Sequence, residues 1–277
     1  MPNFFRNVSW ECLQWQKKQP HVKEESLTDW LLYAVSRKTN RVVYHAFTRN
    51  EEAQGGADWE WWLLTDGQAG LRGSTAYRFL VQAKKLPLGK DAFPQLSYGN
   101  RNGMQIDLLL ASARTRHALP LYLYYSTAAS DPKEQVRNAG LPEVETLLSY
   151  ADCPNGAYLS AARGVQRRVF GAPRRAWPDA DLLQHALGLS VCDLFLSGTG
   201  AAAALLSGIY GACVREELAA GSARPQGIRH FGESLPAYLR FWMDRTRRDG
   251  DWNTLEMQFL PALAGLSGMA VIDLRRG

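Results

Sequence analysis

The stretch GADWEWW (56–62) places two carboxylates, Asp58 and Glu60, among three tryptophans, and it decides how the rest of the chain is interpreted. Its continuation to Thr65 is dominated by aromatic and aliphatic residues, which favour a strand. A second strand-like segment, TAYRFLVQAKKL (75–86), follows after DGQAGLRGS (66–74), whose Gly, Asp and Ser residues favour a turn. The two segments together predict a β-hairpin.

Strand geometry predicts which side chains of this hairpin meet. Successive side chains point to opposite faces of a strand, so Asp58 and Glu60 share one face, as Gln82 and Lys84 do. A turn centred near Gly70 pairs positions whose numbers sum to about 140 to 142. Asp58 is therefore expected opposite Gln82 or Lys84, at one end of a sheet.

The segments around the hairpin predict an α/β fold. Residues 24–38 have the apolar spacing of an amphipathic helix, and RVVYHAFTR (41–49) has strand composition. A second helix is expected over 102–117, followed by a buried strand, LPLYLYYS (119–126). The predicted order is helix, three-stranded antiparallel meander, helix, strand.

The second half of the chain carries weaker signals. Residues 180–218 and 233–247 are expected to be largely helical, and MAVIDL (269–274) has the composition of a last strand. We therefore predict a core over residues 1–130, with a mostly helical accessory region over 131–277 packed on it.

Composition and cysteine usage limit the cellular locations and the kinds of partner that fit this chain. The 277 residues carry a net charge of +5 and a pI near 9.0, a mild excess that permits an anionic partner. The N-terminus has no signal-peptide pattern. Four scattered cysteines, Cys12, Cys153, Cys192 and Cys213, show neither zinc-site nor disulfide-scaffold spacing. A cytoplasmic location is expected.

Residues 194–214 contain no charged side chain and meet the length criterion for a membrane span. Their Gly, Ala and Ser content contributes little to membrane insertion. A closely packed, buried helix is therefore the favoured interpretation, with a membrane span as the alternative.

The polar face of the hairpin suits a hard divalent cation. Mg²⁺ prefers oxygen ligands and is commonly held by one or two carboxylates together with substrate phosphates. Asp58, the side-chain oxygen of Gln82 and the backbone oxygen of Ala83 are candidate ligands of Mg²⁺ or Mn²⁺. Lys84 would orient the attacking water and stabilise negative charge in a transition state. An acid at the start of the first helix, Glu24 or Glu25, would complete the site.

The element order and the pattern D-x(23)-Q-x-K resemble the PD-(D/E)XK nuclease superfamily. The residues that carry the resemblance are Asp58 in GADWEWW and Gln82, Ala83 and Lys84 in VQAKKL. Gln replaces the usual second acid, as in the QxK variant of Mrr-like restriction nucleases. With EESLTD at 24–29, the pattern is also similar to a little-characterised group of bacterial proteins assigned to that superfamily.

The resemblance spans roughly residues 20–126 and implies roles for individual residues. Asp58 and Gln82 would be metal ligands, Lys84 the catalytic lysine, and Glu25, or Glu24, the helix acid. Because glutamine is neutral, a further acid would compensate, and Glu60 or Glu25 could supply it. Tyr98 and Gln105 fall where some relatives place residues that help DNA or metal binding. Outside the stretch that the resemblance covers, Arg163, Arg167 and Arg168 carry positive charge that could bind nucleic-acid phosphates, with a plain charged helix face as the alternative.

The implied activity is metal-dependent hydrolysis of phosphodiester bonds, with DNA favoured over RNA and a setting in restriction or antiphage defence. One alternative is a nucleic-acid-binding or assembly subunit that retains the nuclease fold but has lost catalysis. A second is a membrane-associated effector anchored by residues 194–214. Dimerisation, or a partner protein of a defence system, is left open by the sequence.

Overall fold

The structure is a computed structural model that describes most of the N-terminal half and separate parts of the C-terminal half. The described ranges are 3–47, 56–65, 75–85, 96, 99–100, 103–126, 156–170, 186–189, 192–193, 210–211, 213–219, 221, 228–230, 235–245 and 252–275.

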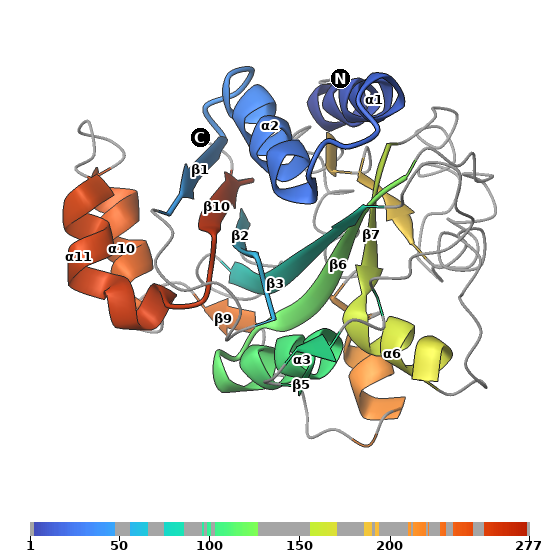
Figure 1. The fold of residues 1–277 in the computed structure, drawn as a ribbon. Helices are drawn as coiled ribbons and strands as arrows, with labels where there is room; N and C mark the ends of the chain where they lie inside the picture. The colour runs from blue at the N-terminus through green and yellow to red at the C-terminus, as the bar shows by residue number, and fades with distance from the viewer. Residues whose placement is uncertain are drawn as a thin grey trace.

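A mixed β-sheet forms the centre of the fold (Figure 1). Within the described ranges it has eight strands, in the order β1-β10-β2-β3-β6-β7-β8, and β9 pairs with the start of β3. These strands are β1 (Val42–Ala46), β2 (Trp59–Thr65), β3 (Thr75–Lys85), β6 (Leu119–Tyr125), β7 (Ala157–Ala161), β8 (Leu187–Gly188), β9 (Ile228–His230) and β10 (Gly268–Asp273). A separate two-stranded ribbon pairs β4 (Gly99–Asn100) with β5 (Gly103–Met104).

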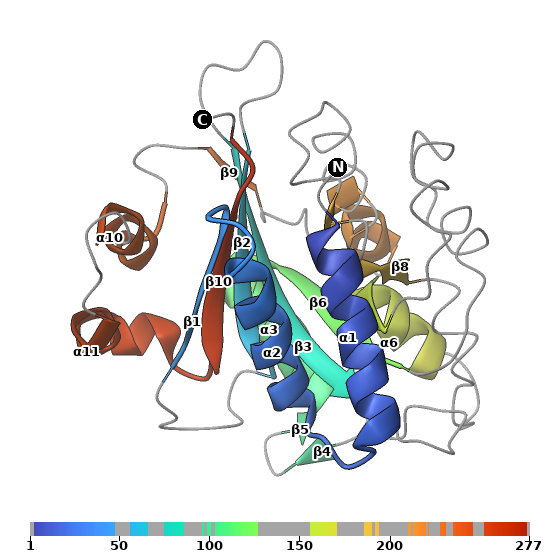
Figure 2. The ribbon, with the colours of Figure 1, turned by 90° about the horizontal axis from the view of Figure 1, so that it is seen from above.

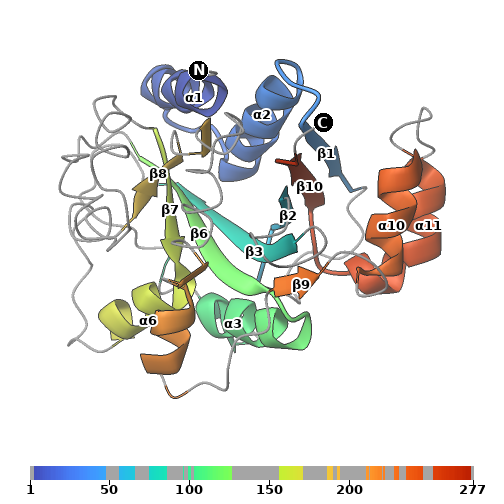
Figure 3. The same cartoon turned by 180° about the vertical axis from the view of Figure 1, so that it is seen from behind.

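Helices cover both faces of the sheet. Figures 1 and 3 show α1 and α2 along one side of it and α3 and α6 on the other, and Figure 2 shows α10 and α11 beside β1 and β10. The helices are α1 (Phe4–Lys18), α2 (Glu24–Ser36), α3 (Gln105–Thr115), α6 (Ala162–Phe170), α10 (Ala237–Arg245) and α11 (Trp252–Leu263). The α/β class predicted from the sequence is confirmed.

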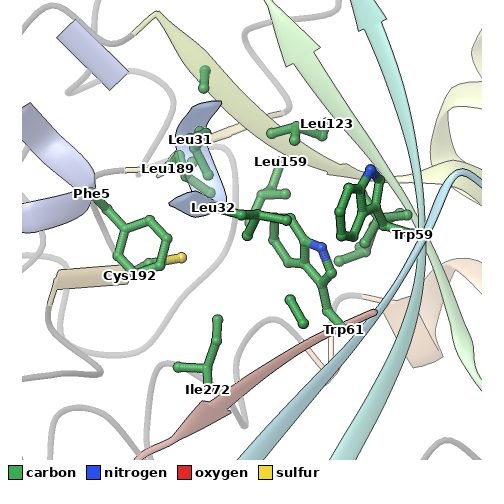
Figure 4. Packing of buried hydrophobic residues seen from close by; sticks show 14 of the residues in the cluster. Phe5, Leu31, Leu32, Trp59, Trp61, Leu123, Leu159, Leu189, Cys192 and Ile272 are labelled. Atoms are coloured by element: carbon green, nitrogen blue, oxygen red, sulfur yellow. The ribbon is translucent and has the colours of Figure 1, made fainter. Parts of the chain in front are cut away.

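Because both faces are covered, the central strands β2 and β6 bury every side chain. All seven residues of β2 are buried, and alternation divides them between two layers. Trp59 and Trp61 pack with Leu31 and Leu32 of α2, as Figure 4 shows. Trp62 packs on the opposite face, in a cluster that includes residues of α10. Full burial of such a large side chain stabilises the fold by about 1.5–3 kcal/mol.

The predicted hairpin and its register are confirmed. Strands β2 and β3 are antiparallel, with Trp59 opposite Val81 and Thr65 opposite Thr75. The Asp58 N–H continues this ladder by donating to the Val81 carbonyl at 2.9 Å. Asp58 consequently enters the sheet beside Gln82, in agreement with the pairing predicted from the position of the turn.

The predicted three-stranded meander is wrong. Strand β1 does not pair with β2, because β10 lies between them, antiparallel to β1 and parallel to β2. The apolar residues of β10 contribute to both layers, Ala270 and Ile272 to one and Met269 and Val271 to the other. This insertion depends on Gly268, where an added Cβ would lie 2.3 Å from a ring atom of Trp59.

The division predicted at residue 130 does not coincide with a boundary of the sheet. Strands β7, β8, β9 and β10, all from the second half, belong to the same sheet as the first-half strands. The C-terminal half therefore completes the sheet, in addition to supplying helices such as α6, α10 and α11.

Two sequence-based expectations fall partly outside the described residues. Of the uncharged stretch 194–214, the structure describes 210, 211, 213 and 214. Within the described ranges, none of the helices combines the length and apolar character that crossing a bilayer requires. Cys12, Cys192 and Cys213 are buried free thiols, and Cys153 lies outside the described residues.

Candidate active site

The candidate site lies at one edge of the sheet, where the ends of two strands and two helices meet. Because β2 and β3 are antiparallel, the start of β2 and the end of β3 meet there. Helix α2 begins at Glu24 and α3 begins at Gln105, and both residues contact the end of β3. The side chains of Asp58, Gln82, Lys84 and Glu24 are thereby brought together.

Asp58 is tied to the end of β3 by two hydrogen bonds. Its Oδ2 accepts from the Gln82 side-chain Nε2 at 2.6 Å and from the Ala83 backbone N–H at 2.8 Å. The same Gln82 nitrogen donates to the Ala83 carbonyl at 3.2 Å. The predicted trio of Asp58, Gln82 and Ala83 thus forms one connected group.

Lys84 faces Glu24, not Glu25. Its Nζ lies 3.6 Å from Glu24 Oε1, and the lysine is 4 % exposed. Glu24 Oε2 also accepts the backbone N–H of Lys85 at 3.1 Å. In the described part of the chain, Glu25 makes no hydrogen bond or ion pair with the site, although its charge contributes to raising the pKa of the neighbouring Glu24. Of the two candidates for the helix acid, Glu24 is therefore the one that the structure places at the end of β3, because it is the first residue of α2.

The Lys85 side chain anchors the segment that leads into α2. Its Nζ donates to the carbonyls of Pro20, at 2.9 Å, and Val22. Burial lowers the pKa of Lys85, and the nearby Glu24 carboxylate opposes that shift. The sequence favours a solvated surface position for Lys85, whereas the structure places its Nζ against the segment before α2.

Burial raises the pKa of both acids of the site. Burial raises the pKa of Asp58 to about 7, and the upward shift persists although Lys84 and the Ala83 N–H both stabilise the carboxylate. Burial also raises the pKa of Glu24, against the opposing effects of Lys84 and the Lys85 N–H. Burial thus outweighs the nearby Lys84 charge at both acids, and a further positive charge beside them would lower both pKa values.

Close backbone packing sets the position of Asp58. Two residues before it, Gly56 adopts a left-handed φ of +66°. An added Cβ at Gly56 would lie 2.4 Å from the Leu109 backbone nitrogen and 2.8 Å from the Gln105 carbonyl oxygen, both in α3. Only glycine fits both the conformation and this approach. The GADWEWW motif therefore enters β2 pressed against the first turns of α3.

Glu60 does not belong to the site, and its assignment as a metal ligand is corrected. The residue is fully buried, and its carboxylate accepts from Arg78 Nη2 at 2.8 Å and from Trp62 Nε1 and the Tyr238 hydroxyl. Arg116 lies at 4.0 Å. The carboxylate is thus fully engaged by a buried network that joins β2 and β3 to α10. Strand alternation could have indicated Arg78, which shares a face with Gln82.

The other predicted nucleic-acid contacts are distributed differently. Gln105 belongs to the site, since its Nε2 donates to Gln82 Oε1 at 3.1 Å. Tyr98 lies outside the described residues. The arginines of α6 form ion pairs with the helical residues 213–219: Arg163 with Glu217 at 3.1 Å, and Arg167 and Arg168 with Glu216 at 2.7 and 3.7 Å. None of these three contacts Asp58 or Lys84 among the described interactions.

Asp58, Gln82 and Ala83 carry the oxygens that could hold a divalent cation such as Mg²⁺ or Mn²⁺. The Asp58 carboxylate and the Ala83 carbonyl converge on one point, where the Gln82 amide nitrogen now lies. Hard cations take such mixed carboxylate, amide and carbonyl oxygens. Within the described ranges, no three His, Cys, Asp or Glu side chains form a metal-binding group. The site would therefore depend on neutral oxygens in addition to its acids.

Comparison with known proteins places the chain in a family. The matching family is described as "Family of unknown function (DUF6615)", and its match covers residues 1–248. The chain belongs to DUF6615. The match includes every residue of the site and ends before β10. Neither the comparison with curated proteins nor the comparison with solved structures found a match.

Proposed function

We propose that this DUF6615 protein is a metal-dependent nuclease that hydrolyses phosphodiester bonds, with DNA as the favoured substrate. The observation that carries the proposal is the group at the end of β3. There, Asp58 and Gln82 are in direct contact and Lys84 lies 3.6 Å from Glu24 Oε1. A structural hairpin does not require two acids, an amide and a buried lysine to meet at one sheet end.

Each residue has a role in hydrolysis under this proposal. Asp58, Gln82 and the Ala83 carbonyl would hold Mg²⁺ or Mn²⁺, which supplies Lewis-acid stabilisation of the phosphate oxygens. Lys84 would orient the attacking water and stabilise the negative charge that develops on the phosphate. Glu24 would hold the Lys84 ammonium in place, since the two are ion-paired. Water would attack phosphorus and release a proton to solvent, while the bond from phosphorus to the leaving oxygen breaks and that oxygen takes up a proton from solvent.

Cleavage assays test the proposal directly. Purified protein is incubated with supercoiled plasmid, single-stranded DNA and RNA, with Mg²⁺, with Mn²⁺ and with EDTA. We expect cation-dependent cleavage of DNA, and a loss of at least about 100-fold in Lys84→Ala, the lower range for loss of one group that stabilises transition-state charge. Lys18→Ala is the matched control, because that lysine is exposed at the end of α1.

Three outcomes separate the proposal from its alternatives. Activity that survives both EDTA and Lys84→Ala would overturn it. Asp58-dependent Mn²⁺ binding without cleavage of any nucleic acid would favour the non-catalytic binding or assembly subunit. Cleavage of RNA but not DNA would retain the chemistry and change the substrate.

A further inference from the structure

A hydrogen bond links the side-chain amides of Gln82 and Gln105 at the proposed cation site. Gln105 Nε2 donates to Gln82 Oε1 at 3.1 Å, and Gln82 Nε2 donates in turn to Asp58 Oδ2 at 2.6 Å. Gln82 is 1 % exposed, so its amide is sequestered from bulk water. Its nitrogen fills the point on which the Asp58 and Ala83 oxygens converge. In this arrangement the protein's own amide takes the position suited to a cation.

The Gln105 amide is incompletely used in this arrangement. Its Oε1 is buried and has no hydrogen-bond partner among the described residues. A buried acceptor without a partner is unfavourable. Nitrogen and oxygen exchange places when an amide turns by half a rotation, so a second arrangement of the two glutamines is available that would use this oxygen.

We propose that Gln105 is a positioning residue that supports two orientations of the Gln82 amide. In the orientation described here, Gln105 donates to Gln82 and the Gln82 nitrogen bonds to Asp58. In the other orientation, both amides are turned: Gln82 Oε1 faces Asp58 and Ala83, and Gln82 Nε2 donates to Gln105 Oε1. Converging oxygens repel each other unless a cation lies among them, so the second orientation accompanies cation binding. This inference rests on the proposed function, because it assumes that the site takes a cation.

Substitutions at position 105 separate the two orientations. A glutamate can accept but cannot donate when ionised, so Gln105→Glu supports only the second orientation. Ala111→Glu, at an exposed position of the same helix, is the control for added charge. We expect Gln105→Glu to bind Mn²⁺ about tenfold more tightly than Ala111→Glu, the change expected for one hydrogen bond. Calorimetry or paramagnetic resonance measures the affinity.

Gln105→Met distinguishes positioning from direct ligation. Methionine removes the hydrogen bond from both orientations, so the Mn²⁺ affinity should stay within about threefold of wild type, well below the effect of losing one hydrogen bond. A loss of more than tenfold in Gln105→Met would overturn the positioning role and indicate that Gln105 is itself a cation ligand.

The turning of the Gln82 amide has its own spectroscopic readout. During a Mg²⁺ titration followed by NMR, the Gln82 side-chain N–H protons should lose their Overhauser contacts to the Asp58 methylene. They should gain contacts to the Gln105 side chain. Persistence of the Asp58 contacts at saturating Mg²⁺ would overturn the inference, because the amide would not have turned.

Failure of this inference is distinguishable from failure of the proposed function. If Asp58→Ala abolishes Mn²⁺ binding but Gln105→Glu binds no more tightly than Ala111→Glu, the positioning role is wrong and the cation site stands. If Asp58→Ala leaves Mn²⁺ binding unchanged, the proposed site is wrong, and the role of Gln105 is overturned with it.

Discussion

The side-chain amide of Gln82 donates to the carboxylate of Asp58 across 2.6 Å, joining the two most distinctive motif residues of the chain. They are 24 positions apart in the sequence and meet because the β2–β3 hairpin has the register that places them together. The contact explains why a strand rich in tryptophan begins with a carboxylate. The tryptophans pack into two apolar layers, one on each face of the sheet, and Asp58 lies directly before the first of them.

Substitution of the two adjacent acids of α2 should have unequal effects. Glu24→Gln removes the negative charge 3.6 Å from Lys84 Nζ, whereas Glu25 makes no described contact with the site. We expect Glu24→Gln to reduce DNA cleavage by about tenfold or more, the effect of losing the ion pair that holds Lys84. Glu25→Gln should stay within about threefold of wild type, which is less than the loss of such a pair.

The comparison has an internal control, because both variants change the same charge in the same turn. Single-turnover cleavage rates at saturating Mg²⁺ measure the effect, and circular dichroism confirms folding. An equal loss in the two variants would show that overall charge near the end of the sheet, and not the contact between Glu24 and Lys84, accounts for the result.

Cation affinity should depend on pH through Asp58. Burial raises the pKa of this carboxylate from 3.8 to about 7, and a divalent cation binds the deprotonated form. Mn²⁺ affinity should therefore fall about tenfold per pH unit below about pH 7 and level off above it, as expected for competition with one proton. An affinity that does not change between about pH 5 and pH 8 would contradict the assignment of Asp58 as a ligand.

The same pKa shift predicts the pH dependence of stability without a cation. The pKa of Asp58 is higher in the folded state, so the folded state binds more protons between about pH 4 and pH 7. The contribution of Asp58 to the free energy of unfolding should therefore decrease as the pH rises through this window. Burial raises the pKa of Asp193 to about 6, within the same window. The difference between wild type and Asp58→Asn isolates the Asp58 contribution.

The sequence predicted the parts of the site that depend on local geometry. Strand alternation and the position of the turn were sufficient to place Asp58 beside Gln82, because a hairpin register is set within one short segment. The choice between Glu24 and Glu25 required the angle at which α2 meets the end of β3. The position of β10 between β1 and β2 could not be predicted in this way, because β10 lies about 200 positions later in the chain. Its close approach to Trp59 requires a glycine at 268. Local patterns carry no information about such a long-range insertion.

Glu60 should matter for stability and not for cation binding. It is fully buried and accepts from Arg78 at 2.8 Å, so Glu60→Gln leaves the guanidinium without a charged partner at that position. Breaking a buried ion pair costs about 3–5 kcal/mol. We expect a loss of this size in the free energy of unfolding, measured by urea denaturation, with unchanged Mn²⁺ affinity in the folded variant.

The Glu60 prediction has a control in the paired variant Glu60→Gln with Arg78→Met. Removing both charges should restore part of the stability lost in the single variant, since no uncompensated guanidinium remains at position 78. A drop in Mn²⁺ affinity in the single variant, with little change in stability, would instead support a direct role for Glu60 at the metal.

Gly56 should prove essential to the position of Asp58. Its φ is +66°, and an added Cβ would lie 2.4 Å from the Leu109 backbone nitrogen, so Gly56→Ala forces the start of β2 away from α3. Gly221→Ala is the matched control for Gly56→Ala: its φ is +72°, but no described atom lies within 4 Å of the added Cβ.

The Gly221→Ala control should show only the cost of the left-handed conformation, about 1–2 kcal/mol of the free energy of unfolding. Gly56→Ala should lose at least about 2 kcal/mol more by urea denaturation, because backbone atoms cannot move aside as side chains do. It should also weaken Mn²⁺ binding, which Gly221→Ala should not. Equal losses of stability in the two variants would show that Asp58 is held by its hydrogen bonds to β3 and not by the approach of Gly56 to α3.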